Sequence, residues 1–350
     1  MKIAIDVSQI VYGTGVSVYT RKLVENLLAI DKEDEFILFG GSLRRFQELK
    51  AFGAKVFPIP PKVGDFIWNR LHILPIEYLV GKIDIFHSSD WTQPPSKSFK
   101  VTTVHDLAPL KFPKSVHPEI VAVHKRRLKW VKKEIDRVIA PSTQTKKDLI
   151  DYGVSEDRIR VIYEASVNPP ADLKRVEEVK KKYQVGQVKY LLSVGITPTK
   201  NTERIIKAFD LAGGGEKLKL VLVGRPVNVK IKERRGVRLL GAVSDNELAA
   251  LYTGAEALVY PSLYEGFGIP VLDAFACGCP VVTSNFSSMP EVAGGAAVLV
   301  DPYSVSSIAE GIKKALGSRK GLIEKGLRRV KDFSWEKTAK ETLKVYSEQH

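Results

Sequence analysis

Cysteine is scarce in this sequence of 350 residues, which contains only Cys277 and Cys279. A C-x-C pair lacks the second ligand pair of a zinc site, and it differs from the C-x-x-C of redox motifs. Two cysteines also exclude a disulfide scaffold. We therefore expect both to be small packing residues in a reducing compartment.

Long hydrophobic runs are absent as well. No run reaches the ~18 consecutive apolar residues that a membrane-spanning helix needs. Asp6 interrupts the first apolar stretch before a signal peptide could form. The composition, with 44% hydrophobic and 27% charged residues, is that of a globular chain. At ~150 residues per domain, the sequence predicts a cytoplasmic protein of two domains.

Negative charge is in deficit, because 40 acidic residues face 54 basic ones and the net charge is +14. Such an excess points to nucleic acid, an anionic membrane face or a phosphorylated substrate. Nucleic acid is disfavoured, since no recognised binding motif accompanies the charge.

Short β-branched runs alternate with helical stretches in two series. Strands are expected first at 2–7, 36–39, 55–59, 84–87, 101–105, 137–140 and 160–163. After a charged linker, a second series is expected at 190–194, 218–223, 237–240, 257–260, 280–283 and 297–300. This alternation predicts parallel sheets covered on both faces, and therefore an α/β protein of two doubly wound domains. The boundaries are expected at 1–168 and 186–331, with a last helix, 332–350, capped by Ser334 and returning to the first domain.

Ligands of open α/β sheets bind at the carboxyl ends of the strands, so the loops there are the candidate sites. The segment 13–17 follows the first strand, and its glycines, Gly15 among them, let backbone N–H groups approach an anion. The alternative is a tight turn in which Ser17 caps the helix.

Three histidines lie where a site residue could stand. His105 follows the run 101–104 and is expected to point toward the ligand, although a structural histidine is the alternative. His87 also ends a strand and is the weaker candidate. His124 falls on an apolar helical stripe, which predicts a packing residue.

Cations follow two strands of the second series. Lys200 precedes a helix start that Asn201 is expected to cap, and this position suits a phosphate. A solvated lysine is the alternative. Arg225 closes the next strand and offers a second cation at the same edge.

The segment 264–273 carries the strongest signal. Glu265 lies in a glycine-rich loop, where its carboxylate could accept hydrogen bonds from sugar hydroxyls. Residues 267–269 expose backbone N–H groups at a helix start, and Pro270 suits the first turn. Hydroxyls beside phosphates are what a nucleotide sugar presents. The alternative is that Glu265 merely caps the turn.

This segment strongly resembles the E-x7-E motif of the retaining GT-B glycosyltransferases of family 4, with Asp273 in place of the second glutamate. Further matches occur in the same order along essentially the whole chain, at 13–19, 105–107, 194–201, 223–225, 278–282 and 333–336. The resemblance implies two Rossmann-like domains facing a cleft. It also implies a retaining hexosyltransferase. No D-x-D metal motif stands in a suitable loop, so no metal ion is expected.

By position, the resemblance places His105 beside the transferred sugar and Glu265 on the hydroxyls of that sugar, as catalytic residues. Lys200 would neutralise the diphosphate, Asp273 would hold the ribose and the backbone near Val243 would meet the nucleobase. The implied donor-binding residues are Gly15, Lys200, Arg225, Val243, Glu265, Phe267, Gly268, Ile269 and Asp273. The sequence departs from the pattern at Thr199 and Ile196, where family members carry arginine, and Arg225 is a candidate replacement.

The His-Asp-Leu form of segment 105–107 resembles mannosyltransferases more than other members, which favours GDP-mannose as the donor and leaves UDP-sugars open. No other cofactor is expected. The acceptor would be a glycan or a lipid-linked glycan. The alternative is a noncatalytic nucleotide-sugar-binding or scaffold protein on the same fold. A Rossmann oxidoreductase is disfavoured because no dinucleotide fingerprint is present.

A helix expected over 118–138 carries much of the excess positive charge. Its apolar stripe would face the core and leave the basic residues outward: Lys125, Arg126, Arg127, Lys129, Lys132, Lys133 and Arg137. An apolar cluster at 66–74 lies upstream, with Lys62 and Arg70. This pattern favours docking on an anionic membrane, at its inner face, to reach a lipid-linked acceptor. The alternative is a solvated basic face.

Overall fold

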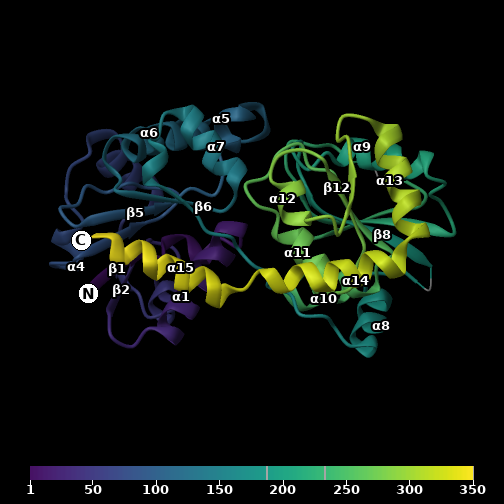
Figure 1. Ribbon diagram of the computed structural model, residues 1–350, viewed down its shortest axis with the longest axis horizontal. Coiled ribbons are helices and arrows are strands. Elements are labelled where there is room, and N and C mark those ends of the chain that lie inside the picture. The colour runs from purple at the N-terminus through teal and green to yellow at the C-terminus, as the bar shows by residue number, and fades with distance from the viewer. Residues whose placement is uncertain (187, 232–233, 350) are drawn as a thin grey trace. The chain divides into compact units, whose positions relative to one another are not determined.

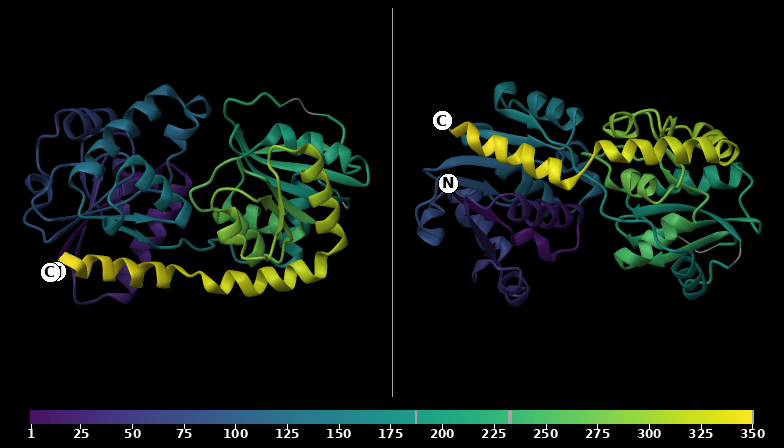
Figure 2. Two further views of the ribbon diagram at one scale, coloured as in Figure 1. Left: turned by 45° about the horizontal axis from the view of Figure 1, so that its top comes forward. Right: turned by 60° about the horizontal axis from the view of Figure 1, so that its bottom comes forward.

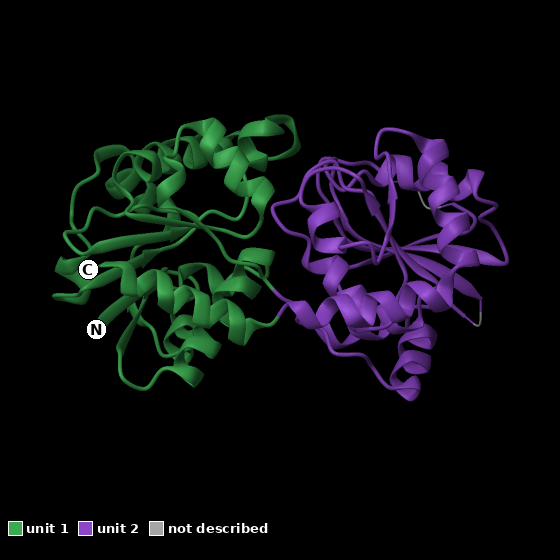
Figure 3. Ribbon diagram, viewed as in Figure 1, with its two compact units in different colours: residues 1–164, 334–350 green, residues 165–333 purple. Residues whose placement is uncertain are grey.

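The computed structural model describes residues 1–186, 188–231 and 234–349. The chain divides into two compact units, of which unit 1 comprises residues 1–164 and 334–350 and unit 2 comprises residues 165–333 (Figure 3). Each unit has its own parallel sheet, and helices flank both faces of each sheet (Figure 1, Figure 2).

The sheet of unit 1 has seven strands in the order β3-β2-β1-β4-β5-β6-β7. The strands are β1 (Lys2–Asp6), β2 (Glu35–Gly41), β3 (Lys55–Phe57), β4 (Ile85–Ser88), β5 (Phe99–Thr103), β6 (Arg137–Ala140) and β7 (Ile159–Val161). In register, Ile5 of β1 lies opposite His87 of β4, which lies opposite Val101 of β5. The loops that follow β1, β4 and β5 therefore leave the sheet side by side.

Unit 1 contains the helices α1 (Gly15–Ile30), α2 (Phe46–Ala51), α3 (Pro61–Gly64), α4 (Glu77–Val80), α5 (Ala108–Lys111), α6 (Pro118–Glu134), α7 (Thr143–Tyr152) and α15 (Trp335–Tyr346). Its π-helix is η2 (Asp65–Leu71), and its 3-10 turns are η1 (Ser8–Val11), η3 (Pro113–Ser115), η4 (Glu156–Arg158) and η6 (Ser347–Gln349). Ser334 caps α15 as predicted, by accepting a hydrogen bond from the N–H of Lys337. The buried face of α15 carries Trp335 and Ala339 and packs against α1 (Figure 1).

The sheet of unit 2 has six strands in the order β10-β9-β8-β11-β12-β13. They are β8 (Lys189–Ile196), β9 (Leu218–Pro226), β10 (Val237–Gly241), β11 (Ala257–Tyr260), β12 (Val281–Ser284) and β13 (Val298–Val300). The helices are α8 (Leu173–Lys182), α9 (Thr202–Leu211), α10 (Asp245–Gly254), α11 (Ile269–Ala276), α12 (Met289–Ala293), α13 (Val305–Gly317) and α14 (Arg319–Arg329), followed by η5 (Val330–Asp332). β-Branched and leucine side chains of this sheet and the apolar face of α13 form one buried core.

The predicted α/β class with two doubly wound sheets is confirmed, and each predicted strand overlaps an observed one. Cys277 and Cys279 are buried and form no disulfide, as expected of packing residues, and burial raises the pKa of both thiols to about 12. Within the described ranges, no helix combines the length and the apolar character that crossing a bilayer requires.

Two helix starts are capped differently from what the sequence suggested. Thr14, not Ser17, caps α1, and Ser17 completes a reciprocal capping box as the third helical residue. Asn201 stands at the start of α9 in a left-handed conformation, but its side chain makes no capping bond and donates instead to the carbonyl oxygens of Pro261 and Pro302. A tertiary contact therefore replaces the local one.

The basic helix also needs correction. It ends at Glu134 rather than at 138, and Arg137 begins β6 and pairs with Glu348. Arg127 does not face outward, because its side chain is fully buried. Arg126 binds the carboxylate of Asp65 at 2.6 Å. The exposed basic residues of α6 are the lysines: Lys125, Lys129, Lys132 and Lys133.

Candidate active site

Unit 2 brings two predicted site residues into direct contact. Lys200 follows β8 and Glu265 follows β11, and these strands are neighbours in the sheet. The Nζ of Lys200 donates to Glu265 Oε1 at 2.6 Å. Tyr260, the last residue of β11, donates its hydroxyl to the same oxygen at 3.0 Å and also contacts the Lys200 ammonium. The site is therefore a cation, a carboxylate and a phenol in mutual contact.

The charge of Lys200 is held by these partners. Burial alone would lower the pKa of this lysine, but the charge of Glu265 and the contact with Tyr260 outweigh it and raise the pKa above its usual value. The two side chains keep 24% and 13% of their surface exposed, so a ligand can reach the pair. Lys200 is therefore positively charged at neutral pH.

The loop that carries Glu265 is held by a side chain that bonds to its backbone. Ser287 Oγ accepts from the N–H of Glu265 at 3.1 Å and donates to its carbonyl oxygen at 2.8 Å. Gly268, which precedes α11, has a φ of +125°, and a Cβ there would lie 2.5 Å from Cε of Met289. Only glycine fits this position without strain. The first turn of α11, with Pro270 in it as predicted, is therefore held at one orientation.

Asp273 lies on α11 with 3% of its surface exposed. Its Oδ1 accepts hydrogen bonds from Ser166 Oγ at 2.7 Å and from the N–H groups of Val167 at 2.8 Å and Asn168 at 3.2 Å. Its Oδ2 accepts from Asn168 Nδ2 at 2.7 Å. Both oxygens of this short carboxylate thus fasten segment 166–168, and its contact with a ribose stays a prediction.

The other donor-side candidates of unit 2 lie near strand ends and at the start of α11. Arg225 is exposed near the end of β9, and Val243 is half-buried between β10 and α10. Phe267 is buried, and its ring meets Phe333 edge-on with centroids 5.8 Å apart. Ile269 is the first residue of α11. Their donor roles stay predictions.

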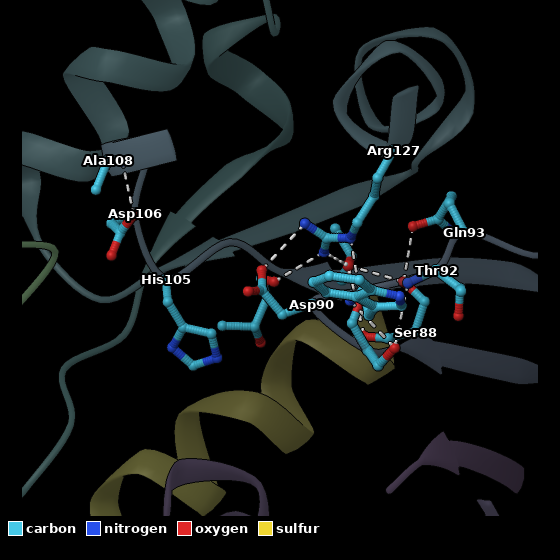
Figure 4. Close-up of polar contacts among 12 residues, drawn as sticks. Ser88, Asp90, Thr92, Gln93, His105, Asp106, Ala108 and Arg127 are labelled. Carbon is cyan, nitrogen blue, oxygen red and sulfur yellow. Dashed lines mark hydrogen bonds and ion pairs between the residues drawn. The ribbon is translucent and has the colours of Figure 1, made fainter. Parts of the chain in front are cut away.

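Unit 1 holds the two remaining site candidates. Gly15 is the first residue of α1, it is exposed, and a Cβ there would meet no atom within 4 Å. His105 follows β5, and its Nδ1 lies 3.1 Å from Glu164 Oε1 (Figure 4 shows this histidine beside Asp90). Burial would lower the pKa of His105, but the hydrogen bond and charge of Glu164 raise it above its usual value.

His87 and His124 are both buried and held by neighbouring side chains. The Nδ1 of His87 contacts the hydroxyl of Tyr346 at 2.7 Å, and its Nε2 contacts Thr103 Oγ1 at 3.0 Å. Burial lowers the pKa of His87 to about 3, which keeps it neutral. His124 is buried and packs its ring edge-on against Trp91, as expected of a packing residue.

Sequence reasoning missed Tyr260 and Glu164, although a signal for both was present. Tyr260 is the last residue of the predicted strand 257–260, and Glu164 follows the predicted strand 160–163 directly. Both therefore lie at the carboxyl edge of a parallel sheet, where ligand-binding side chains gather. Had every polar residue at the end of a predicted strand been treated as a site candidate, both would have been identified.

Known proteins resemble this chain over most of its length. Residues 175–329 match the family model for glycosyl transferases group 1, and residues 13–165 match that for glycosyltransferase family 4. The O-antigen chain mannosyltransferase RfbU of Salmonella typhimurium is 32% identical over 325 residues, which cover 86% of this chain and 87% of the relative. The O-antigen chain mannosyltransferase B of Escherichia coli is 30% identical over 287 residues, covering 75% and 74%.

Solved structures share the fold. Anabaena Alr3699/HepE in complex with UDP and glucose superposes with a TM-score of 0.73 at 16% identity, covering 99% of this chain and 100% of that one. WaaG, a glycosyltransferase involved in lipopolysaccharide biosynthesis, gives 0.71 at 14% identity, covering 98% and 99%. The architecture is that of the GT-B glycosyltransferases. The chain belongs to the family of the glycosyl transferases group 1.

Proposed function

We propose that this protein transfers a sugar, with mannose favoured, from a nucleotide diphosphate sugar to a glycan or lipid-linked acceptor. The contact of Lys200 with Glu265 carries the proposal, because it sets a cation for phosphates beside an acceptor for sugar hydroxyls. The two O-antigen relatives are both mannosyltransferases, which supports mannose. The neighbour bound to UDP and glucose supports a nucleotide sugar, so GDP-mannose is the first donor to test.

Donor binding exchanges one ion pair for two better-matched contacts. The diphosphate brings negative charge to Lys200, which in the free protein is neutralised by Glu265. Glu265 is then released to accept hydrogen bonds from the hydroxyls of the sugar. The start of α11 adds the partial positive charge of a helix N-terminus on the same side of the loop.

The reaction is proposed to retain the anomeric configuration by front-face attack, without a metal ion. The acceptor oxygen forms a bond to the anomeric carbon on the face from which the diphosphate departs. The bond from that carbon to the phosphate oxygen breaks, and its electron pair leaves on the nucleoside diphosphate. The acceptor proton passes to the departing phosphate. Lys200 stabilises the charge that develops there.

The test is a donor screen with product analysis. Wild-type protein is incubated with GDP-mannose, UDP-glucose or UDP-N-acetylglucosamine, and release of the nucleoside diphosphate and the configuration of any product are measured. Glu265→Gln should lower release by about 100-fold or more. Glu310→Gln, a matched change at an exposed site of α13, should not alter it. Nucleotide-sugar binding without turnover would instead establish the noncatalytic binding protein.

We also infer that unit 1 docks on an anionic membrane surface. The exposed lysines of α6 supply charge, and about 1 kcal/mol per basic residue is typical near anionic lipid. The neighbouring α3 and η2 supply exposed apolar side chains, with Val63 42%, Phe66 52% and Leu71 49% exposed. Trp68, in contrast, is buried in the core. The combination of lysines with exposed apolar side chains supports a lipid-linked acceptor.

A further inference from the structure

A buried arginine fastens the loop that follows β4. Arg127 of α6 is 0% exposed. Its Nε donates to the carbonyl oxygen of Ser89 at 3.1 Å, and its Nη1 to Asp90 Oδ1 at 3.1 Å (Figure 4). Its Nη2 donates to Thr102 Oγ1 at 2.7 Å and to the carbonyl oxygen of Thr103 at 3.0 Å. One guanidinium thus ties loop 88–93 to the end of β5.

Stability alone does not account for this arginine. The desolvation of a buried ion pair offsets much of its attraction, and an apolar side chain of similar size often stabilises a core as well. What the guanidinium does supply is position, because its planar fork fixes a carboxylate oxygen in direction as well as in distance. The carboxylate so positioned is Asp90, which keeps 15% of its surface exposed.

Asp90 lies near His105, the residue predicted to stand beside the transferred sugar. It lines a small cavity at the carboxyl edge of the sheet together with Thr20 and His105. Figure 4 shows Asp90 and His105 next to each other, reached from neighbouring strands. The charge of Asp90 also acts on the His105 ring.

The next residues of the same loop line a larger, mainly apolar cavity. Trp91 and Thr92 face a space of about 270 Å³, which Tyr12 and Trp68 also line. Aromatic faces beside a carboxylate match the two sides of a pyranose, because its C–H groups pack on rings and its hydroxyls donate to acceptors.

We propose that loop 88–93 recognises a sugar as the acceptor, with Asp90 accepting a hydrogen bond from one of its hydroxyls beside His105. Trp91 contributes to the neighbouring cavity, and Arg127 is a positioning residue that acts through Asp90. That the bound sugar is the acceptor of the transfer reaction rests on the proposed function. The binding of a sugar to unit 1, in contrast, can be measured without any donor.

The experiment measures glycoside and donor binding separately. Dissociation constants of the methyl glycosides of mannose, glucose, galactose, rhamnose and N-acetylglucosamine are measured by ligand-observed NMR on the full chain, and that of GDP-mannose by calorimetry. Asp90→Asn should weaken binding of at least one glycoside ten-fold or more and leave GDP-mannose unchanged. The matched control is Asp84→Asn, which alters the same residue type just before β4, at the opposite end of the strand. It should change neither.

Two further variants separate recognition from structure. Asp90→Glu keeps the charge beside Arg127 but moves the carboxylate by one methylene, and it should also weaken glycoside binding. Arg127→Lys keeps a cation and loses the fork, so it should weaken binding in the wild-type background and add little to Asp90→Asn. Independent, additive losses would mean that Arg127 does not act through Asp90.

The possible results distinguish failure of this inference from failure of the proposed donor. If no glycoside binds the wild type, or if Asp90→Asn lowers only the melting temperature while Asp90→Glu keeps wild-type affinity, Asp90 is merely the counter-ion of Arg127 and the inference is wrong. Failure of GDP-mannose to bind, with glycoside binding intact and sensitive to Asp90, refutes the proposed donor and not this site.

Discussion

Replacing Glu265 by glutamine should make the protein bind nucleoside diphosphate more tightly while it loses transfer. In the free protein Glu265 Oε1 lies 2.6 Å from the Lys200 ammonium. A diphosphate that approaches Lys200 therefore competes with this carboxylate and is repelled by it. Glutamine keeps an oxygen acceptor of the same shape and removes the negative charge, so both penalties fall.

The size of the effect follows from the partial burial of the pair. Unit charges in contact near a protein surface interact by about 4 kcal/mol at an effective dielectric constant of about 20. Because the same groups can hydrogen-bond to water instead, the net free-energy contribution of such a charge-assisted hydrogen bond is only about 1.5–3 kcal/mol. Since the amide retains part of that bond, we expect a gain near the lower limit, and about 1.4 kcal/mol corresponds to ten-fold tighter binding. Transfer should fall by about 100-fold or more, as when a charge-stabilising partner of a transition state is removed.

Calorimetric titration with GDP and UDP measures the first quantity, and turnover of the active donor measures the second. Guanosine and uridine serve as ligand controls, because they lack the phosphates and should bind the variant and the wild type equally. Tyr260→Phe is the matched side-chain control, since it removes the hydroxyl that contacts both Glu265 and Lys200 and leaves both charges in place. Unchanged or weaker GDP binding by Glu265→Gln would refute the competition between carboxylate and diphosphate.

Three further predictions address the cation, the histidine and the basic face. Lys200→Ala should weaken nucleoside diphosphate binding more than nucleoside binding, and equal losses by calorimetry would contradict the phosphate role. The raised pKa of His105 means that its pairing with Glu164 contributes stability that is fully present below the ordinary pKa of 6.5 and fades as pH rises through the higher folded value. The melting temperature of His105→Gln should accordingly lack the decline that the wild type shows across this window, and equal profiles would remove the pairing as its cause. Binding to anionic vesicles should fall after reversal of the exposed α6 lysines to glutamate, and it should fall for the wild type as salt shortens the Debye length from ~10 Å at 0.1 M to ~3 Å at 1 M. The reversed residues are Lys125, Lys129, Lys132 and Lys133, and the control with the same charge change on unit 2 reverses Lys313, Lys314, Lys320 and Lys325. Cosedimentation that does not distinguish the two variants would identify the α6 face as merely solvated.

Local patterns in the sequence were sufficient for the architecture. Alternating apolar strands and amphipathic helices dictate parallel sheets, because a strand buried on both faces needs helices above and below it. The cap of α15 at Ser334 and the proline in the first turn of α11 were equally readable, since each depends on residues within one turn. The placement of Lys200 and Glu265 at the carboxyl edge of their sheet followed from the rule that ligands bind there, but their contact depends on β8 and β11 being neighbours.

Other features depended on contacts between distant segments. Asn201 exchanges its capping bond for the carbonyl oxygens of Pro261 and Pro302, which lie about sixty and a hundred positions later in the chain. Asp273 stands where the motif places a ribose contact, yet its oxygens are taken by residues 166–168. Neither partner can be read from the local sequence, because hydrogen-bond partners are chosen by topology.

Arg127 shows most clearly what the sequence determined and what the tertiary structure decided. The sequence predicts an outward-facing Arg127 among the basic residues of α6, although its spacing, three residues after His124 and four before Val131, sets it next to the apolar stripe. Such a cation is buried only if the core offers hydrogen-bond acceptors for it. Otherwise its side chain is exposed to solvent. Here the strand order sets the ends of β4 and β5 side by side beneath α6, and they offer a carboxylate, a hydroxyl and two carbonyl oxygens. Those acceptors are separated in the chain and meet only in the fold, which is why the structure alone reveals that this charge is buried and that Asp90 is positioned by it.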